Sequence, residues 1–357
     1  MKLRLGSLEA NYINDGDTSG RSDFFQAAEF DLATAPSASA AFGVYGASAP
    51  KIGHDFGGSY VKLGAAKYYV SYTLGGAGWD ANSDGLVLNA EAQWKRYITK
   101  IGKSNYILPV QFNAQTQKYV TYDATKWYNA DYTTREPVKN DSYERRCAGC
   151  HVTGLRVSLD GDEWVMNYAD ISVACEACHG PGGRRATAPT KSNIINPATM
   201  VTDKDLNGDG AIDQVDNVIV RNYVCFPCHS RGAGKYSAAG VKLSYFSRDD
   251  GSGKPLMYMP GLDWKEYYDI STTAGDYWGG DPTSGDFVAS LGHHQQQQDF
   301  AYGSHRADKS FDHECFVCHD LHSRTNKNSV TTGITTGSGV KVITQNDDNT
   351  LCLACHA

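Results

Sequence analysis

The amino-acid sequence predicts a loop-rich protein with little regular secondary structure, short helices around repeated motifs and a small antiparallel β segment in the N-terminal part. Three observations support this prediction. All ten cysteines fall into five copies of one pentapeptide, Cys-x-x-Cys-His. Glycine is abundant, with 37 residues, and only 20% of the residues are charged. Short runs of β-branched and aromatic residues precede the first cysteine and are separated by turn residues.

The five motifs indicate covalently attached haem c, because two thiols add to the haem vinyl groups and the adjacent imidazole binds the iron. The attachment residues are Cys147, Cys150, Cys175, Cys178, Cys225, Cys228, Cys315, Cys318, Cys352 and Cys355. The proximal iron ligands are His151, His179, His229, His319 and His356. Zinc sites need two such pairs or distant histidines, a thioredoxin-like motif normally occurs once, and a disulfide scaffold does not repeat one tight pentapeptide. We therefore expect five haems c.

The elements along the chain follow from local patterns. Residues 1–56 are rich in alanine, serine and glycine and are expected to be extended or irregular. Five short runs predict an antiparallel meander, at residues 60–63, 67–73, 94–99, 106–112 and 118–122. Alternating apolar residues on both sides of 160–161, an Asp-Gly pair, predict a hairpin. The distribution of cysteines predicts a haem-free, partly β region at 1–140 and a pentahaem region at 141–357.

Histidines outside the motifs are the candidates for the second, distal position on each iron. Five bis-histidine haems need five further imidazoles, and the chain has six: His54, His293, His294, His305, His313 and His322. One of the adjacent pair at 293 and 294 is the expected spare. Methionine ligation is the alternative, and its candidates are Met166, Met200, Met257 and Met259. Six-coordinate iron has no open position for a substrate, so this inventory favours electron transfer over enzymatic catalysis.

Composition limits the surroundings and partners of the protein. The formal charge is −7, and the haem propionates add more negative charge, so neither nucleic acid nor an anionic membrane is an expected partner. The mean hydropathy is −0.46, and no apolar run reaches the ~18 residues of a transmembrane helix. Haem c is attached outside the cytoplasm, so export is expected, although the sequence begins without an apolar signal segment. We expect that a signal has been removed.

Two acidic loops are candidate calcium sites. The first follows the EF-hand-like pattern and offers oxygens from Asp205, Asn207, Asp209, Ala211, Asp213 and Asp216. The second is weaker because Leu88 occupies its ninth position, and its candidates are Asp80, Asn82, Asp84, Leu86 and Glu91. An acidic surface turn is the alternative for each.

Three stretches carry a resemblance to extracytoplasmic multihaem c-type cytochromes. They are residues 94–113, the pair of motifs at 147–155 and 175–183, and residues 293–322, which contain HHQQQQDF, a Ser-His pair and CHDLH. The sequence is similar to members of this group that include bacterial and archaeal subunits of extracellular cytochrome filaments, or nanowires. The resemblance covers about a third of the chain, by the extent of these stretches. Five haems differ from the four, six or eight that we associate with the filament-forming types.

The resemblance implies a multihaem cytochrome c fold with a loop-rich, haem-packed core. It makes His305 and His322 the firmest distal ligands. It also implies long-range electron transfer by a head-to-tail homopolymer, in which a histidine of one subunit can ligate a haem of the next. His54, which lies far from the other histidines in the sequence, is the candidate for that role. Redox proteins or an extracellular acceptor would be further partners, at the cell surface or in the extracellular space, with the periplasm as the alternative. A discrete electron carrier and a multihaem reductase with one open haem are the competing functions.

Overall fold

The computed structural model describes residues 29–55, 57–75, 78–80, 85–87, 94–113, 116, 118–170, 173–197, 221–278, 289–291, 294–302, 315, 334–335 and 341–342. The chain forms two compact units, which we call unit 1 (Met1–Val173) and unit 2 (Ala174–Ala357). The first attachment motif belongs to unit 1 and the other four belong to unit 2. The division into haem-free and pentahaem regions at residue 140 stays a prediction about haem content.

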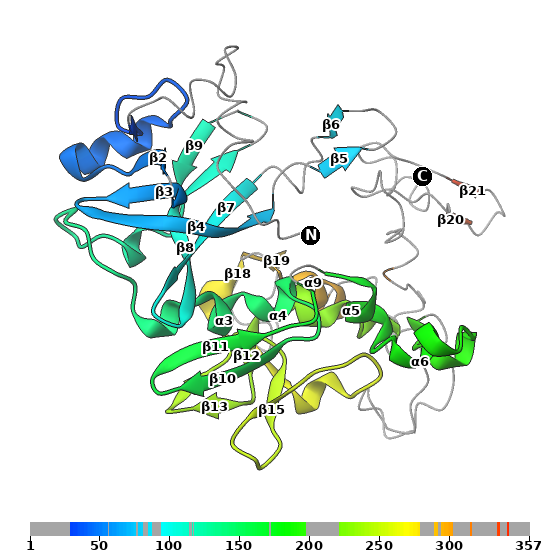
Figure 1. Cartoon of the computed structure of the whole chain (residues 1–357). Coiled ribbons are helices and arrows are strands. Elements are labelled where there is room, and N and C mark those ends of the chain that lie inside the picture. Colours follow the sequence, from blue (N-terminus) through cyan, green and yellow to red (C-terminus); the bar gives the residue numbers. More distant parts are fainter. Residues whose placement is uncertain are drawn as a thin grey trace. The chain divides into compact units, whose positions relative to one another are not determined.

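Unit 1 is built on an antiparallel sheet of seven strands, in the spatial order β1-β2-β3-β4-β7-β8-β9 (Figure 1). Its strands are β1 (Phe30–Asp31), β2 (Lys51–Asp55), β3 (Gly58–Leu63), β4 (Ala66–Gly75), β7 (Trp94–Ile101), β8 (Ser104–Asn113) and β9 (Lys118–Thr121). Each strand pairs with the next described strand of the sheet along the chain, which is the meander that the sequence predicts. The five expected runs correspond to β3, β4, β7, β8 and β9.

The sheet curls so that its two edges approach the same short segment of chain. At one edge, β1 pairs with β2, with Phe30 opposite Ile52. At the other edge, the backbone of Tyr119 in β9 bonds to both Ser37 and Ser39, at N···O distances of 2.8 and 2.7 Å. Only a few residues separate these two contacts in the sequence, so the sheet must bend to reach both. Curling of this kind covers the exposed strand edges.

The expectation of extended or irregular structure in residues 1–56 fits the strands of the described part of that segment but missed a helix. It contains β1, β2 and the nine-residue 3-10 helix η1 (Ala40–Ser48). Phe42 in η1 is fully buried among the hydrophobic residues of the sheet. The alanine- and serine-rich composition gave no signal for η1. The strand β2 was missed for another reason, because it is recruited by pairing with β3 rather than by its own strand propensity.

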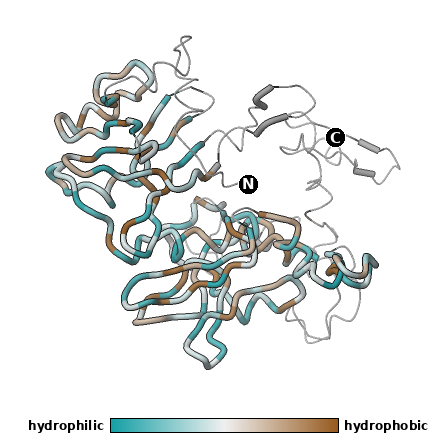
Figure 2. The backbone as a smooth tube through the Cα atoms, viewed as in Figure 1, coloured by the Kyte–Doolittle hydropathy of each residue, from teal (hydrophilic) through white to brown (hydrophobic). Residues whose placement is uncertain are grey.

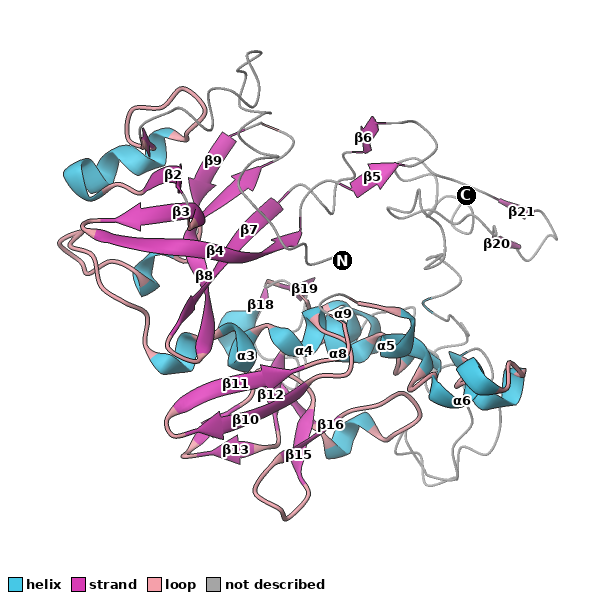
Figure 3. Ribbon diagram, in the orientation of Figure 1, coloured by secondary structure: helices cyan, strands magenta, loops and turns pink. Residues whose placement is uncertain are grey.

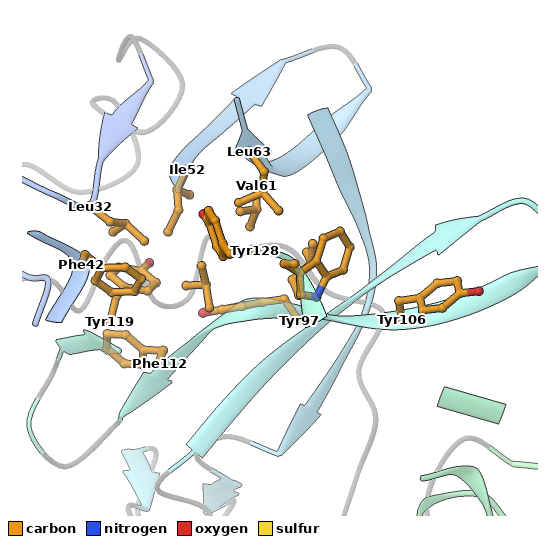
Figure 4. Close-up of a cluster of buried hydrophobic side chains, with 13 residues drawn as sticks. Leu32, Phe42, Ile52, Val61, Leu63, Tyr97, Tyr106, Phe112, Tyr119 and Tyr128 are labelled. Atoms are coloured by element: carbon orange, nitrogen blue, oxygen red, sulfur yellow. The ribbon is translucent and has the colours of Figure 1, made fainter. Parts of the chain in front are cut away.

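Thirteen buried hydrophobic residues fill the inside of the curled sheet (Figure 4). They are Leu32, Phe42, Ile52, Val61, Leu63, Tyr97, Tyr106, Leu108, Val110, Phe112, Tyr119, Trp127 and Tyr128. Every second residue of β8 from Tyr106 to Phe112 belongs to this set, as expected for a strand with one face toward the core. The Trp127 indole donates to the carbonyl of Ile107 at 2.9 Å, so the largest side chain of the core is also hydrogen-bonded.

Further short elements complete the described part of unit 1. They are β5 (Gly78–Asp80), β6 (Gly85–Val87), η3 (Ala124–Lys126), η4 (Lys139–Asp141), α3 (Tyr143–Arg146), α4 (Ala148–His151), β10 (Arg156–Asp160) and β11 (Glu163–Asn167). The expected hairpin is confirmed as β10 and β11, but Asp160 pairs with Glu163, so the two-residue turn is 161–162. Gly161 has a φ of 71°, which a glycine adopts at no steric cost.

The described residues of unit 2 form short helices and two-stranded pairs rather than one extended sheet (Figure 3). Its helices are α5 (Cys175–His179), α6 (Gly183–Thr187), η5 (Lys191–Asn193), α8 (Phe226–His229), η7 (Trp264–Glu266), η8 (Ala274–Asp276) and α9 (Gln296–Tyr302). Its strands are β12 (Gly232–Gly234), β13 (Ser237–Ala238), β14 (Val241–Lys242), β15 (Ser247–Asp249), β16 (Pro255–Met257), β17 (Tyr268–Ile270), β18 (Tyr277–Trp278), β19 (Ala289–Ser290), β20 (Ile334–Thr335) and β21 (Lys341–Val342).

An aromatic cluster forms the described hydrophobic core next to the third motif. Tyr223, Phe226, Phe246, Tyr267 and Tyr268 are its buried members. The rings of Phe246 and Tyr268 stack at 4.2 Å with an interplanar angle of 14°. Since Phe226 lies inside the third attachment motif, this cluster holds that motif in place.

Hydrophobic stretches along the described chain are short and alternate with hydrophilic ones (Figure 2). Among the residues that the structure describes, no helix is long and apolar enough to cross a membrane.

Candidate haem sites

Three attachment motifs lie on single helical turns. The second motif forms α5, whereas in the first and third motifs the first cysteine is the N-cap residue of the helix, α4 or α8 (Figure 3). In a helix, residues three and four positions apart share one face. Each turn therefore presents both thiols and the following imidazole on the same side. The short helices expected around the motifs are confirmed for these three copies.

The second motif holds its histidine in the form that binds iron. The Nδ1 atom of His179 lies 2.9 Å from the carbonyl oxygen of Ile195. A carbonyl oxygen only accepts hydrogen bonds, so Nδ1 carries the proton and Nε2 keeps its lone pair. Gly180 allows this approach: its φ is 66°, and a Cβ atom there would lie 2.8 Å from the Ile195 side chain. The residues present therefore fit a haem c at this position.

The third motif has a different acceptor for its histidine. The Nδ1 atom of His229 lies 3.2 Å from the Oε1 atom of Gln296, at the start of α9. In the sequence, Gln296 is distinguished only as part of HHQQQQDF, and no role follows from that pattern. Ile195 could not be identified from the sequence, because it takes part through its backbone carbonyl and not through its side chain.

The third and fourth motifs lie next to each other inside unit 2. The Cys225 and Cys315 side chains hydrogen-bond to each other, and Cys178 lies close enough to Cys225 to affect its ionisation electrostatically. The bond raises the pKa of Cys225, which donates, and lowers the pKa of Cys315, which accepts. The amide side chain of the fully buried Asn222 accepts a hydrogen bond from the Cys315 backbone N–H at 2.8 Å. Residues far apart in the sequence are thus brought together.

The seven cysteines that the structure describes are all free of disulfide bonds. Burial raises the pKa of the Cys147 thiol to about 11. A reactive thiol–disulfide motif needs a lowered thiol pKa, because the thiolate is its nucleophile. The environment of the first motif therefore agrees with a site of covalent attachment better than with a thioredoxin-like centre.

Two buried side chains from α3 lie beside the first motif. The Tyr143 hydroxyl has no hydrogen-bond partner among the described residues, although the side chain is 1% exposed. Both Cys147 and Cys150 are near enough to influence its ionisation. A buried unpaired hydroxyl next to two attachment cysteines is expected where a polar group of a ligand completes the site.

Glu144, the other buried residue of α3, accepts hydrogen bonds from Asn105 in β8. The backbone N–H of Asn105 lies 3.1 and 3.0 Å from the two carboxyl oxygens, and its side-chain amide lies 2.5 Å from one of them. Burial raises the pKa of Glu144 to about 7, although the bonds from Asn105 and the charge of Lys100 act in the opposite direction. This carboxyl links the sheet of unit 1 to the turn that precedes the first motif.

Two of the six distal candidates lie within the described residues. His54 is on β2, and its Nδ1 lies 3.2 Å from the Ser59 hydroxyl on β3. His294 precedes α9 and has a φ of 61°, which is unusual for a non-glycine residue. The remaining candidates lie outside the described residues, namely His293, His305, His313 and His322.

The other predicted site residues are described only in part. Those outside the described residues are Cys318, His319, Cys352, Cys355, His356, Met200, Asn82, Asp84, Glu91 and the whole loop 205–216. Asp80 ends β5 and Leu86 lies in β6, where the backbones pair as a two-stranded ribbon. Within the described ranges, no group of three or more His, Cys, Asp or Glu side chains is placed to hold a metal ion. The calcium sites stay predictions.

Residues 111–180 match the protein family described as cytochrome c554 and c-prime. The matched segment runs from β8 to the end of the second attachment motif. This finding confirms the resemblance to multihaem c-type cytochromes. Comparison with curated proteins gives no match.

Two solved structures resemble the chain. The crystal structure of the outer cell wall cytochrome OcwA is 19% identical over 81% of this chain and 56% of its own, with a TM-score of 0.47. The undecahaem cytochrome from the S-layer of Carboxydothermus ferrireducens is 17% identical over 76% of this chain and 35% of its own, with a TM-score of 0.31. The chain therefore spans little more than half the length of the first protein and about a third of the second.

Proposed function

We propose that this protein transfers electrons over long distances through five covalently bound haems c, each with two axial histidines. Haem supplies a reversible one-electron change at its iron. The chain's own residues attach the group, present the proximal imidazoles and exclude water around them. The observation that supports the proposal best is the 2.8 Å hydrogen bond from the Cys315 backbone N–H to Asn222, because it places the fourth motif beside the third, and haems attached to neighbouring motifs must themselves be neighbours.

Electron transfer is favoured over catalysis because the histidine supply matches the demand for distal ligands. The chain offers six imidazoles outside the motifs for five irons. An enzyme of this class would need one iron with an exchangeable position. Carbon monoxide added to the reduced protein distinguishes the two functions: we expect no binding, whereas one equivalent bound per chain would support the reductase.

The number of haems has a direct test. We expect each of the five motif-containing peptides from a proteolytic digest to carry one haem by mass spectrometry. The intact protein should contain five haems per chain by its pyridine haemochrome spectrum. A motif peptide of unmodified mass would lower the number, and unmodified peptides throughout would overturn the proposal.

The proposal extends to an exported protein that works at the cell surface or in the extracellular space as the repeating subunit of a cytochrome filament. Covalent haem attachment outside the cytoplasm supports export, and the resemblance stated above supports the filament. His54 is the proposed donor to a haem of a neighbouring subunit, and it is partly exposed on β2. A discrete periplasmic or surface carrier is the alternative.

Negative-stain microscopy of native material tests the filament. We expect His54→Ala to shorten or abolish filaments and to open one haem to carbon monoxide. Lys51→Ala is the matched control on the same strand, since it removes only a partly exposed ion pair with Asp31. Monomers with all haems ligated within one chain would contradict the filament and leave the electron-transfer proposal intact.

Calcium binding at 205–216, and more weakly at 80–91, is part of the same proposal. It predicts that chelation with EGTA lowers the thermal stability and that added calcium restores it. Unchanged stability after chelation would remove calcium from the proposal.

A further inference from the structure

We propose that Gln296 is a positioning residue for His229, the proximal histidine of the third motif, and that it sets the reduction potential of the haem bound there. This inference rests on the proposed function, because it assumes that a haem c occupies the motif. It starts from one contact, in which the Oε1 atom of Gln296 lies 3.2 Å from the Nδ1 atom of His229.

The chemistry of the imidazole decides the direction of this hydrogen bond. When Nε2 binds iron, the proton of a neutral imidazole is on Nδ1, which then needs an acceptor. The amide oxygen of Gln296 is such an acceptor. This hydrogen bond fixes the plane of the imidazole ring. It also makes Nε2 a stronger electron-pair donor to iron. A stronger donor stabilises the oxidised iron and lowers the reduction potential.

Buried contacts at the start of α9 hold Gln296 in this place. Gln298 is fully buried, and its side-chain amide donates to the carbonyl of Arg231 at 2.8 Å, two residues after His229. One turn away, the carboxylate of Asp299 accepts from the backbone N–H of Ser290 at 2.9 Å. These bonds fix α9 to the segment that follows the third motif. They hold the Gln296 side chain beside His229 although Gln296 itself is exposed.

The second motif offers an internal comparison. His179 donates to a backbone carbonyl, which no substitution can remove, whereas His229 donates to a side chain, which a single substitution can change. Of these two motifs, the third is therefore the one whose proximal hydrogen bond can be strengthened or removed without altering the attachment motif. We expect its potential to respond to residue 296 while the second haem keeps its potential.

Two substitutions at residue 296 test the inference in opposite directions. Gln296→Leu removes the acceptor and should shift one component of a potentiometric titration to higher potential. Gln296→Glu supplies a charged acceptor and should shift the same component lower. The electron paramagnetic resonance spectrum of one low-spin haem should change with both variants. The other four haems should keep their potentials and their signals.

Asp299→Asn is the matched control for charge. It removes one negative charge from the same helix but keeps an oxygen for Ser290. We expect it to change the reduction potential of the third haem much less than Gln296→Glu does. The inference would be overturned if Asp299→Asn and Gln296→Glu shifted the reduction potential of the third haem equally in opposite directions while Gln296→Leu left it unchanged. That result would mean that charge alone sets the potential.

The haem content, measured first, separates failure of the inference from failure of the proposed function. Absence of haem from the third motif would remove the proposed function at this site. Five haems per chain, with titrations and resonance spectra unchanged by Gln296→Leu, would overturn only the role of Gln296.

Discussion

Thirteen buried hydrophobic residues line one curled sheet in unit 1, whereas the described core next to the third motif of unit 2 has five buried aromatic residues. Strands of up to ten residues pair along most of their length in unit 1. The described strands of unit 2 have two or three residues each and pair only in twos. The first arrangement can bury a core with side chains alone, and the second offers few side chains for that purpose.

This difference indicates where the prosthetic groups contribute to stability. Burying the apolar faces of haem supplies the hydrophobic stabilisation that short strands and loops lack. Unit 1 has one attachment motif and an extended sheet, while unit 2 has four motifs. We therefore expect unit 2 to depend on its haems for folding and unit 1 to keep its sheet without one.

Removing one haem from each unit is the most direct test of this difference in haem dependence, and it should have the largest effect. We expect Cys225→Ala with Cys228→Ala to make unit 2 susceptible to limited proteolysis, because the third motif adjoins the buried aromatic cluster and contacts the fourth motif. Cys147→Ala with Cys150→Ala should leave the strands of unit 1 protected in hydrogen exchange. Equal loss of protection in both units for both pairs of substitutions would show that haem dependence is not confined to unit 2.

A cavity in the sheet should act on unit 1 alone. Leu108 is fully buried in β8, and its replacement by alanine should cost about 2–5 kcal/mol. The exchange rates of β8 amides should rise accordingly, while the visible haem spectrum stays unchanged. Val44→Ala is the control, since Val44 is 56% exposed and its truncation should change stability by less than about 0.5 kcal/mol.

The stability of unit 1 should fall as the pH rises from about 4.5 to about 7. The pKa of Glu144 is raised by burial to about 7, so the folded state prefers the protonated carboxyl. The stabilisation is complete below the ordinary pKa near 4.5 and is lost as the pH passes the folded pKa. The shift corresponds to a loss on the order of 3 kcal/mol.

Hydrogen exchange of β8 amides at pH 5 and pH 8 measures this effect. Glu144→Gln should remove the pH dependence, because its amide oxygen still accepts from Asn105 but cannot ionise. A slope that survives this substitution would mean that another group titrates. Glu163→Gln is the control, since it replaces a carboxyl on the β10–β11 hairpin and should leave the pH dependence unchanged.

Helix caps should give the smallest effects and sharpen the comparison between the units. The Ser142 hydroxyl accepts from the backbone N–H of Arg145 at the start of α3, and Asp263 accepts from that of Lys265 at the start of η7. Ser142→Ala and Asp263→Ala should each cost about 1 kcal/mol. We expect local exchange to report each loss within its own unit. A loss that spreads from one unit to the other would indicate that the two fold together.

Much of the fold of unit 1 could be predicted from sequence, because strand propensity and alternation are local properties. The runs that became β3, β4, β7, β8 and β9 were visible as aromatic and β-branched stretches. The strand β2 was not, since glycine, lysine and aspartate are all depleted in strands and only pairing with β3 makes it a strand. The turn of the β10–β11 hairpin was displaced by one residue, because register depends on both strands.

The candidate sites divide in the same way. The cysteines and histidines of the predicted attachment sites follow from a five-residue pattern, and one helical turn is enough to bring them to one face. Gln296 lies 67 positions from His229 in the sequence, and Ile195 takes part through its backbone. Neither relation can be read from a local pattern, because both depend on how separate segments return to the same place.

From the sequence alone come five Cys-x-x-Cys-His motifs, six further histidines as candidate iron ligands and a β meander that precedes the motifs. Folding in three dimensions was needed to show that the sheet curls on itself, that the fourth motif lies beside the third and that a glutamine faces the histidine of the third motif. Covalent chemistry and strand propensity act between neighbours along the chain. Closure, convergence and hydrogen bonds to imidazole act between residues that only folding brings into contact.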